Sequence, residues 1–371
     1  MGDAVNMETQ GEHARVQDVI RKRILDGEWG AGFKIPSERD LESELGVSRM
    51  TISKGLAPLV AEGLLTRRQG SGTYVNDQSQ LRRHRVQWVK MLCATSPNNL
   101  RASINHGVLE GAYDALGGYG IHVGVDFYQA MNDQVALLDR PYAPGEGGLL
   151  IWFEPLPGNV AALARLRKRG VPFVVLDAYP EDLDVDFAVS DNVAGGALMV
   201  QHLVELGHRR VGYLSRPVDR SSLRDRLTGF LQGAVTHQLP YSSDDVVVIR
   251  QPRELVLDEV PRVVDHFLAL SPRPTAICFS NDELALTAAA YLQQKGIRIP
   301  EDVSLVGYDN VEQSKFGPVP LTSVQQDFYG MGKAAGKILG EQLNGAKSGP
   351  TSHLFLKPEL IVRSSVARLS V

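Results

Sequence analysis

The chain has little cysteine, and the two that occur argue against a disulfide framework. Cys93 and Cys278 are the only cysteines among 371 residues. Each lies in an apolar run typical of a strand, so we expect buried, reduced thiols and no thiolate metal site. The nine histidines show no metal-ligand spacing, because the nearest pair, His202 and His208, flanks the end of an expected helix. The sequence therefore indicates neither a bound metal nor a cofactor.

Long hydrophobic runs are also missing. No window is apolar and uncharged over the length of a membrane span. The N-terminal stretch MGDAVNMETQGEHA lacks the charged-then-apolar pattern of a secretory signal. We therefore expect a cytoplasmic protein and neither a membrane protein nor a secreted transport receptor. The length and the 43% hydrophobic content suit two or three globular domains.

The chain has only a small net charge, but its basic and acidic residues are unevenly distributed. The formal net charge is −4. Residues 14–85 contain 13 Lys/Arg and 9 Asp/Glu, whereas the remaining chain contains 26 and 34. A basic segment joined to an acidic body is typical of a nucleic-acid reader attached to a separate domain. Its last part, residues 77–85, carries Arg82, Arg83 and Arg85, and we interpret it as a basic linker near the DNA backbone.

The basic segment contains the stretch KIPSERDLESELGVSRMTISKGLAPLVAEGLLTRRQGSGTYV, from Lys34 to Val75. Ser37 and Asp40 resemble a capping box that begins a short helix, and Gly46 ends this helix. Ser48 caps a second helix, whose apolar residues recur at helical spacing. Two short strands follow, joined by the glycine-rich turn QGSG. Together with an amphipathic helix before it, this stretch predicts a winged helix-turn-helix domain over residues 12–76.

The side chains of this stretch suit DNA, because phosphate oxygens and guanine edges need cationic and short polar donors. The ordered motifs PSER, LGVSR, EGL and QGSGT resemble the GntR family of bacterial regulators. This resemblance implies that Arg39, Arg49 and Thr51 contact DNA. The chain departs from the family at Ser53, where an arginine is frequent, and at Pro58, which we expect to kink the second helix. The candidate DNA-binding residues are Arg39, Ser48, Arg49, Thr51, Ser53, Lys54, Arg67, Arg68, Gln69 and Gly70.

From Val86 onward, short apolar runs rich in β-branched residues alternate with amphipathic helical patterns. The expected strands are VQWVKMLCA, IHVGVDFY, GLLIWF, PFVVLD, RVGYLS, DVVVI, TAICFS and VSLVGYD. This alternation predicts parallel sheets covered by helices on both faces. Because there are more strands than one compact sheet needs, we expect two α/β subdomains with a cleft between them. Ligands of such sheets bind beyond the carboxyl ends of the strands.

Polar side chains follow several of these strands. Asp177 comes after PFVVL, an Asn-Asp pair after AICFS, and Asp309 after SLVGY, while Arg226 lies early in a helix. A guanidinium, two carboxylates and a carboxamide in one cleft would bind a polyhydroxylated molecule, since each hydroxyl both donates and accepts. Residues of this kind also cap helices, and that alternative stays open for Asp191 and Asp282.

The segments SDNVAGGALMVQHLVELGHRRVGYLS, RDRLTGF, SNDELALTAAAYLQQKGIRIPEDVSLVGYDN and LTSVQQDF resemble the effector domain of LacI/GalR-type repressors, which is built like periplasmic sugar-binding proteins. The resemblance implies a ligand-binding trio of Arg226, Asn281 and Asp309, with Asp177 opposite and Phe328 as an aromatic wall. It also implies chain crossings near 189, 325 and 350. The effector domain would then span 86–371, with a first subdomain of 86–189 and about 328–350 and a second of 190–325 and about 351–371. The candidate effector-binding residues are Ser96, Leu100, Trp152, Asp177, Ser222, Arg226, Asn281, Asp309 and Phe328.

A GntR-type reader joined to a LacI-type effector domain resembles the arabinose repressors of Gram-positive bacteria. We expect a repressor that binds operator DNA as a homodimer and responds to a sugar such as a pentose or hexose. One alternative is a regulator that responds to a nucleoside or a sugar phosphate. The other is an enzyme with an α/β catalytic body, against which the sequence shows no nucleophile–base set or metal cluster. The GxG motif at Gly70–Gly72 lacks a third glycine and precedes a strand, which argues against a dinucleotide site.

Overall fold

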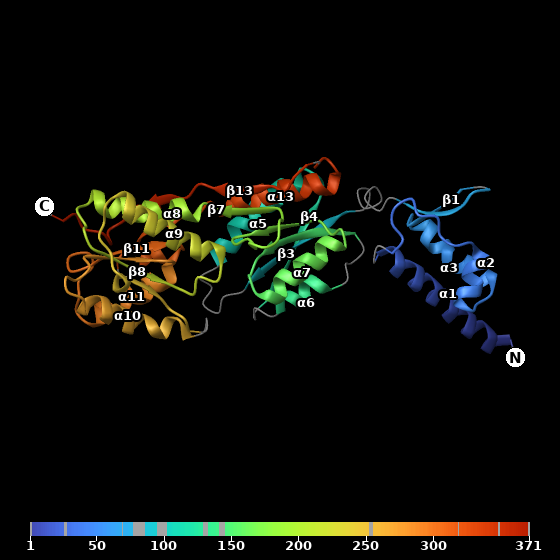
Figure 1. Cartoon of the computed structure of the whole chain (residues 1–371), viewed down its shortest axis with the longest axis horizontal. Helices are drawn as coiled ribbons and strands as arrows, with labels where there is room; N and C mark the ends of the chain where they lie inside the picture. Colours follow the sequence, from blue (N-terminus) through green and yellow to red (C-terminus); the bar gives the residue numbers. More distant parts are fainter. Residues whose placement is uncertain are drawn as a thin grey trace.

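The computed structural model describes most of the chain. The described residues are 2–25, 28–68, 70–76, 86–94, 102–128, 133–140, 145–251, 255–317, 319–347 and 349–369. The predicted linker 77–85 and the candidate residues Gln69, Ser96 and Leu100 lie outside these ranges. Figure 1 shows an N-terminal domain and a body made of two α/β subdomains. Within the described ranges, no helix combines the length and the apolar composition that crossing a bilayer requires.

The N-terminal domain has the predicted winged helix-turn-helix order. Its elements are α1 (Gly2–Leu25), α2 (Glu38–Leu45), α3 (Arg49–Ala61), β1 (Leu65–Arg68) and β2 (Gly72–Val75). Ser37 and Asp40 form the expected capping box, and Gly46 ends α2 with φ of 68°. Ser48 caps α3, which runs past Pro58 to Ala61. The predictions of both caps and of the antiparallel hairpin are therefore confirmed.

The hairpin of the N-terminal domain gains a third, short edge segment. The Gly32 N–H donates to the Val75 carbonyl over 2.9 Å, and the Ile35 N–H donates to the Thr73 carbonyl over 3.0 Å. Lys34 thereby lies opposite Tyr74 in an antiparallel bridge. The inner face of this small sheet packs on α1, α2 and α3 in one core, whose buried residues are Val16, Ile20, Ile24, Trp29, Ile35, Leu41, Val47, Ile52, Leu56, Leu59, Leu65 and Val75.

The first subdomain is a parallel sheet between two helix layers. Its strands are β3 (Trp88–Ala94), β4 (His122–Tyr128), β5 (Glu146–Trp152), β6 (Phe173–Leu176), β7 (Phe187–Ser190) and β13 (His353–Leu356), in the order β13-β7-β6-β5-β3-β4. Successive strand residues face opposite layers. One face packs against α5 (Ala102–Gly117) and α13 (Phe328–Asn344), and the other packs against α6 (Asp133–Asp139) and α7 (Pro157–Lys168).

The second subdomain repeats this plan. Its strands are β8 (Val211–Ser215), β9 (Val246–Val248), β10 (Ala276–Phe279), β11 (Ser304–Tyr308), β12 (Thr322–Gln325) and β14 (Glu359–Ile361), in the order β14-β12-β11-β10-β8-β9. All neighbours are parallel except β12 and β14. Helices α8 (Asn192–Glu205) and α9 (Ser221–Thr236) cover one face, and α10 (Val260–Ala269) and α11 (Asp282–Gln294) cover the other.

The chain passes between the two sheets three times. It crosses after β7, after β12, and between β13 and β14. The third crossing differs from the expectation, which placed it near 350 and assigned the chain from 351 onward to the second subdomain. His353–Leu356 instead pairs in parallel with β7 as an edge strand of the first sheet. Only the strand after it joins the second sheet, because its partner is β12.

Helix α9 is held close to α8 by glycine. A Cβ atom on Gly229 would collide with the backbone carbonyl of Val193, and one on Gly196 would collide with the carbonyl of Arg226. Any larger residue at either position would force the two helices apart. This close packing matters for the site described below, because the first two turns of α9 carry several of its side chains.

Candidate functional site

The N-terminal domain presents exposed cations on two neighbouring helices. Arg39 lies in the first turn of α2, and Lys54 lies one turn into α3, both on the surface. Arg49, the first residue of α3, has 71% of its side chain exposed. A helix that begins with such residues can place them against base edges and phosphates in a major groove.

One carboxylate organises two of the predicted DNA-binding arginines. Glu38 accepts from Arg49 Nε over 3.3 Å and from an Arg67 guanidinium nitrogen over 3.1 Å. The same Arg67 nitrogen lies 3.4 Å from Ser53 Oγ. Glu38 therefore links α2, α3 and the wing strand β1. Its place inside the PSER motif was visible in the sequence, but its contact with the wing depends on the tertiary fold.

Three predicted positions near the helix start and the wing have specific local roles. Ser48 Oγ accepts from the Thr51 N–H over 3.2 Å and bonds the Thr51 hydroxyl over 2.8 Å. Thr51 is only 6% exposed, so this side chain is engaged at the helix start and is much less accessible than Arg49. Gly70 has φ of 71° at the wing turn, a conformation that favours glycine.

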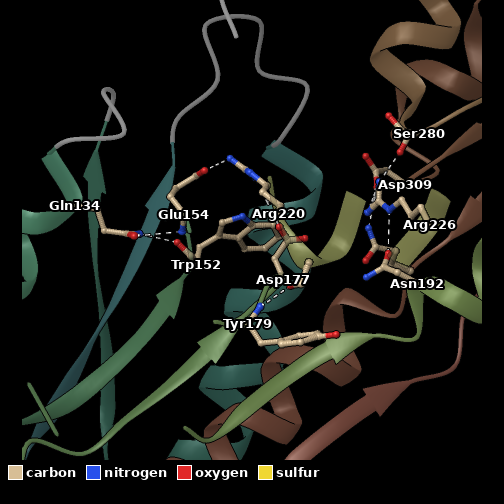
Figure 2. A network of polar contacts seen from close by, with 12 residues as sticks. Gln134, Trp152, Glu154, Asp177, Tyr179, Asn192, Arg220, Arg226, Ser280 and Asp309 are labelled. Carbon is tan, nitrogen blue, oxygen red and sulfur yellow. Dashed lines mark hydrogen bonds and ion pairs between the residues drawn. The ribbon is translucent and has the colours of Figure 1, made fainter. Parts of the chain in front are cut away.

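A second group of predicted residues meets where the two sheets of the body face each other. Trp152 ends β5, Asp177 follows β6, Asp309 follows β11, and Arg226 lies in α9 after β8. Side chains at the carboxyl ends of parallel strands converge in this way. Figure 2 shows Trp152 and Asp177 on one side of the group and Arg226 with Asp309 on the other. We call Trp152, Glu154, Asp177, Arg220, Arg226, Asp309 and Phe328 the interdomain site.

Arg226 organises the half of the interdomain site that belongs to the second subdomain. It is 4% exposed, and its guanidinium donates to Asn192 Oδ1 over 2.9 Å and to the Ser280 carbonyl over 2.5 Å. It also pairs with Asp309 over 3.2 Å and stacks on the Tyr308 ring at 3.8 Å. Burial disfavours the charge, but Asp309 and the other nearby groups favour it more. The pKa of Arg226 is consequently raised, and the guanidinium stays protonated.

The two predicted carboxylates share an unusual backbone conformation. Asp177 has φ of 69° and Asp309 has φ of 102°, in the left-handed region that few residues other than glycine adopt. Asp309 is further held by Gln326, whose Nε2 donates to its Oδ1 over 2.8 Å. Strained residues of this kind cluster at functional sites, where the surrounding contacts over-determine them.

The first subdomain contributes a pair of aromatic rings backed by a polar network. The rings of Trp152 and Phe328 lie 6.4 Å apart at 38°. The carbonyl of Trp152 accepts from Tyr128 Oη over 2.8 Å and from Gln134 Nε2 over 2.7 Å. Gln134 Oε1 accepts from the backbone N–H of Glu154 over 3.2 Å. The buried Gln134 thus fixes the end of β5, and with it the position of the indole.

The first turns of α9 reach across to the first subdomain. Arg220 pairs with Glu154, and its other guanidinium nitrogen lies 3.8 Å from Asp177 Oδ2. The Tyr179 N–H donates to Ser221 Oγ over 2.8 Å, and the Tyr179 hydroxyl donates to Asp225 over 2.9 Å. Figure 2 shows the Arg220 side chain reaching toward Glu154, above Trp152 and Asp177. The interdomain site therefore has a polar bridge between the subdomains along one side.

Of the strand-end residues outside this group, some cap helices and one does not. Asp191 Oδ1 accepts from the Ala194 N–H over 2.9 Å, so it caps α8. At α11 the cap is Asn281, which accepts from the Leu284 N–H over 3.3 Å. Asp282 is instead buried and accepts from the Val311 N–H and the Ser323 hydroxyl over 2.9 and 2.7 Å. Burial and then the charge of Asp309 raise the pKa of Asp282 to about 7.

Three other residues discussed in the sequence analysis are buried. Ser222 is buried in the first turn of α9. Cys93 and Cys278 are both buried and free, as predicted. In the part of the chain that the structure describes, no group of three or more His, Cys, Asp or Glu side chains could hold a metal ion.

Sequence reasoning missed Glu154, Arg220 and Asn192. A signal existed for each: Glu154 directly follows the expected strand GLLIWF, Asn192 comes two residues after β7, and Arg220 lies six residues before Arg226. The pairing of Glu154 with Arg220 had no such signal, because the two residues are 66 positions apart in the chain.

Comparisons with known protein families match the N-terminal domain and part of the body. Residues 13–75 match the model of the bacterial regulatory proteins of the gntR family. Residues 200–366 match a periplasmic binding protein-like domain. The chain is 30% identical to an arabinose metabolism transcriptional repressor of Halalkalibacterium halodurans, over 97% of both chains. It is also 31% identical to the HTH-type transcriptional repressor PurR of Aliivibrio salmonicida, over 60% of this chain and 65% of that protein.

Solved structures share the fold of the body. A complex of the transcriptional regulator CelR with cellobiose superposes with a TM-score of 0.67 at 22% identity, covering 89% of this chain and 100% of that chain. A LacI family transcriptional regulator from Enterococcus faecium with bound ribose has a TM-score of 0.62 at 23% identity, covering 76% of this chain and 100% of that chain. At these identities the similarity establishes the fold.

Proposed function

Because the chain belongs to the GntR-type transcriptional regulators that carry a periplasmic binding protein-like domain, we propose that it is a repressor controlled by a neutral sugar. The sugar would bind in the interdomain site and change the affinity of the N-terminal domain for operator DNA. The names of its relatives support the class of ligand, since one represses arabinose metabolism and two solved neighbours hold cellobiose and ribose.

The observation that carries this proposal is the chemistry of the interdomain site. Asp309 and Asp177 offer carboxylate oxygens to hydroxyl protons, and Arg226 and Arg220 offer guanidinium donors. Trp152 and Phe328 supply two aromatic rings whose centres lie 6.4 Å apart. A sugar ring presents hydroxyls at its edge and apolar C–H groups on its faces, so it would use both kinds of surface.

The charges of the site favour a neutral ligand over a phosphate. Arg220 already faces Glu154 and Asp177, and Arg226 already pairs with Asp309. A sugar phosphate would meet three carboxylates and would compete with each of them for a guanidinium. A neutral hydroxyl can share these groups without bringing a second negative charge into a buried site.

A homodimer completes the proposed mechanism. One winged helix reads a short half-site, whereas two linked domains raise the effective concentration of the second once the first is bound. A ligand that changes how the two subdomains are oriented would change the spacing of the two readers. The proposal predicts an operator with two-fold symmetry and a dimer in sedimentation at the concentrations that bind DNA. A monomer under those conditions would contradict this part of the mechanism.

Titration calorimetry with the full chain tests the ligand class. The panel contains neutral pentoses, hexoses and disaccharides beside sugar phosphates and purine bases. We expect micromolar binding of one neutral sugar, and a ligand at about 100 times its Kd should stabilise the chain by about 2.7 kcal/mol in thermal unfolding. Binding of only a phosphorylated sugar or a purine would overturn the neutral-sugar assignment.

Two conservative variants connect the binding to the site. Asp177→Asn keeps the side-chain shape but removes a charge, and Phe328→Leu shortens the aromatic surface. Both should weaken sugar binding at least tenfold. Phe316→Leu is the matched control, because Phe316 is 78% exposed on α12 (Gln313–Phe316) and lies outside the interdomain site. Equal affinity in all three variants would place the sugar elsewhere.

A further inference from the structure

We propose that Lys34 binds a DNA backbone phosphate together with Arg68, on the outer face of the wing. This inference rests on the proposed DNA-binding function and adds a contact outside the helix-turn-helix and its hairpin. Lys34 belongs to the edge segment that precedes α2, and it was not among the residues predicted from the sequence.

The strand register places Lys34 and Arg68 on one face. Lys34 lies opposite Tyr74, and Tyr74 lies opposite Thr66. Arg68 is two residues beyond Thr66 and opposite Gly72. Directly opposed residues and residues two apart share a face of a sheet, so these side chains all point the same way.

The other face of the same small sheet is the buried one. Leu65, Val75 and Ile35 are 1%, 2% and 3% exposed and pack in the core of the N-terminal domain. The face with Lys34, Tyr74 and Arg68 therefore points away from that core. Arg67 alternates to the core side of the strand and reaches Glu38 and Ser53 near α3. The wing thus divides its cations between the helix side and the outer face.

The two cations of the outer face, Lys34 and Arg68, do not contact Glu38 as Arg49 and Arg67 do. The Arg68 guanidinium stacks over the Tyr74 ring at 4.6 Å, which orients the group and leaves its N–H edge available. Lys34 is exposed, and within the described residues its ammonium makes no ion pair or hydrogen bond. Arg49 and Arg67, in contrast, both contact Glu38. An unpaired ammonium can bind a phosphate without first breaking a contact in the protein.

The wing turn directs the lysine chain. Gly72 has φ of 122°, and a Cβ atom at this position would lie 2.7 Å from Lys34 Cε. The alkyl chain of Lys34 therefore crosses the backbone of Gly72, beside the turn that carries Gly70. A side chain at position 72 would displace the lysine. Glycine at this position thus allows both the turn conformation and the approach of the ammonium to the wing tip.

The test is the salt dependence of binding to a labelled 30-base-pair duplex of mixed sequence, measured by fluorescence anisotropy with the full chain. Each phosphate contact contributes about 0.9 to the slope of log affinity against log salt. This slope is negative, so Lys34→Gln should make it shallower by about 0.9. The variant should bind more weakly than wild type at 50 mM salt, and this difference in affinity should shrink by about 3.5-fold at 200 mM salt. Lys34→Arg should keep the wild-type slope. Lys337→Gln, the same charge change on α13 at an exposed residue, should also keep it.

The outcomes separate this inference from the function on which it rests. If the wild-type chain does not bind the duplex at low salt, the proposed DNA-binding function fails. If the wild type binds and Lys34→Gln has the same slope, only the assignment of Lys34 fails. Equal losses in Lys34→Gln and Lys34→Arg would show that the lysine acts through the structure of the wing and would also overturn the assignment.

Discussion

Replacing Arg226 with methionine tests whether this guanidinium holds the second subdomain together. The substitution removes a charge that joins Asn192 at the start of α8, the Ser280 carbonyl after β10, and Asp309 after β11. Removing one member of a buried ion pair costs about 3–5 kcal/mol. The total stability of a domain is about 5–15 kcal/mol, so the loss is a large fraction of it. For a domain of this size it corresponds to a lowering of the melting temperature by about 6–20 °C.

Differential scanning calorimetry is the appropriate assay. The three tryptophans, Trp29, Trp88 and Trp152, belong to the N-terminal domain or the first subdomain, so none reports on the second subdomain alone. Adding Asp309→Asn to Arg226→Met removes both charges. The double variant should therefore lose less than the sum of the single variants. Arg298→Met, at an exposed arginine paired with Asp302, should leave the transition unchanged. A loss below about 1 kcal/mol for Arg226→Met, or strict additivity in the double variant, would show that this guanidinium does not hold the second subdomain together.

Single residues outside the interdomain site can be tested one at a time. Arg49→Ala should weaken operator binding by about 1–3 kcal/mol and relax the sequence preference at one base pair. Equal losses of affinity for operator and random duplexes would show that Arg49 contacts only a phosphate. Burial raises the pKa of Cys93 to about 12 and also raises that of Cys278, so a thiol reagent at pH 8 should modify neither until the chain unfolds; rapid labelling of the native protein would contradict this. Asp282 has a folded-state pKa raised to about 7, so its contribution to stability is greatest at low pH and is lost as the pH rises from about 4 to 7. Asp282→Asn should therefore flatten the pH dependence of the melting temperature over that range, and an unchanged slope would count against the raised pKa.

The N-terminal domain could be predicted closely from the sequence because its signals are local. The capping box at Ser37, the left-handed Gly46 and the cap at Ser48 each depend on residues three or four positions away. The same is true of the alternation of strands and helices in the body, which predicted two parallel sheets. Interactions between residues so close in the chain can be predicted from the sequence alone.

The remaining features depend on contacts between distant segments. β13 joins the first sheet only because it meets β7, more than 160 residues earlier in the chain, and no local pattern distinguishes its two possible sheets. The pair of Arg220 with Glu154 forms only when both subdomains are assembled. The conformation of Asp309 depends similarly on Arg226 and Gln326. Residue type therefore predicted which side chains suit the site, while the fold determines which of them meet.

If a neutral sugar in the interdomain site controls DNA binding, then sugar binding and operator affinity must change together, and one experiment can measure both. An operator duplex selected from a random library with the full chain is followed by anisotropy while each sugar of the panel is added. We expect one neutral pentose or hexose to change operator affinity at least tenfold. The Asp177→Asn variant should lose this response and still bind the operator normally without sugar. If no neutral sugar changes the affinity, or if Asp177→Asn responds as the wild type does, a sugar in the interdomain site does not control DNA binding.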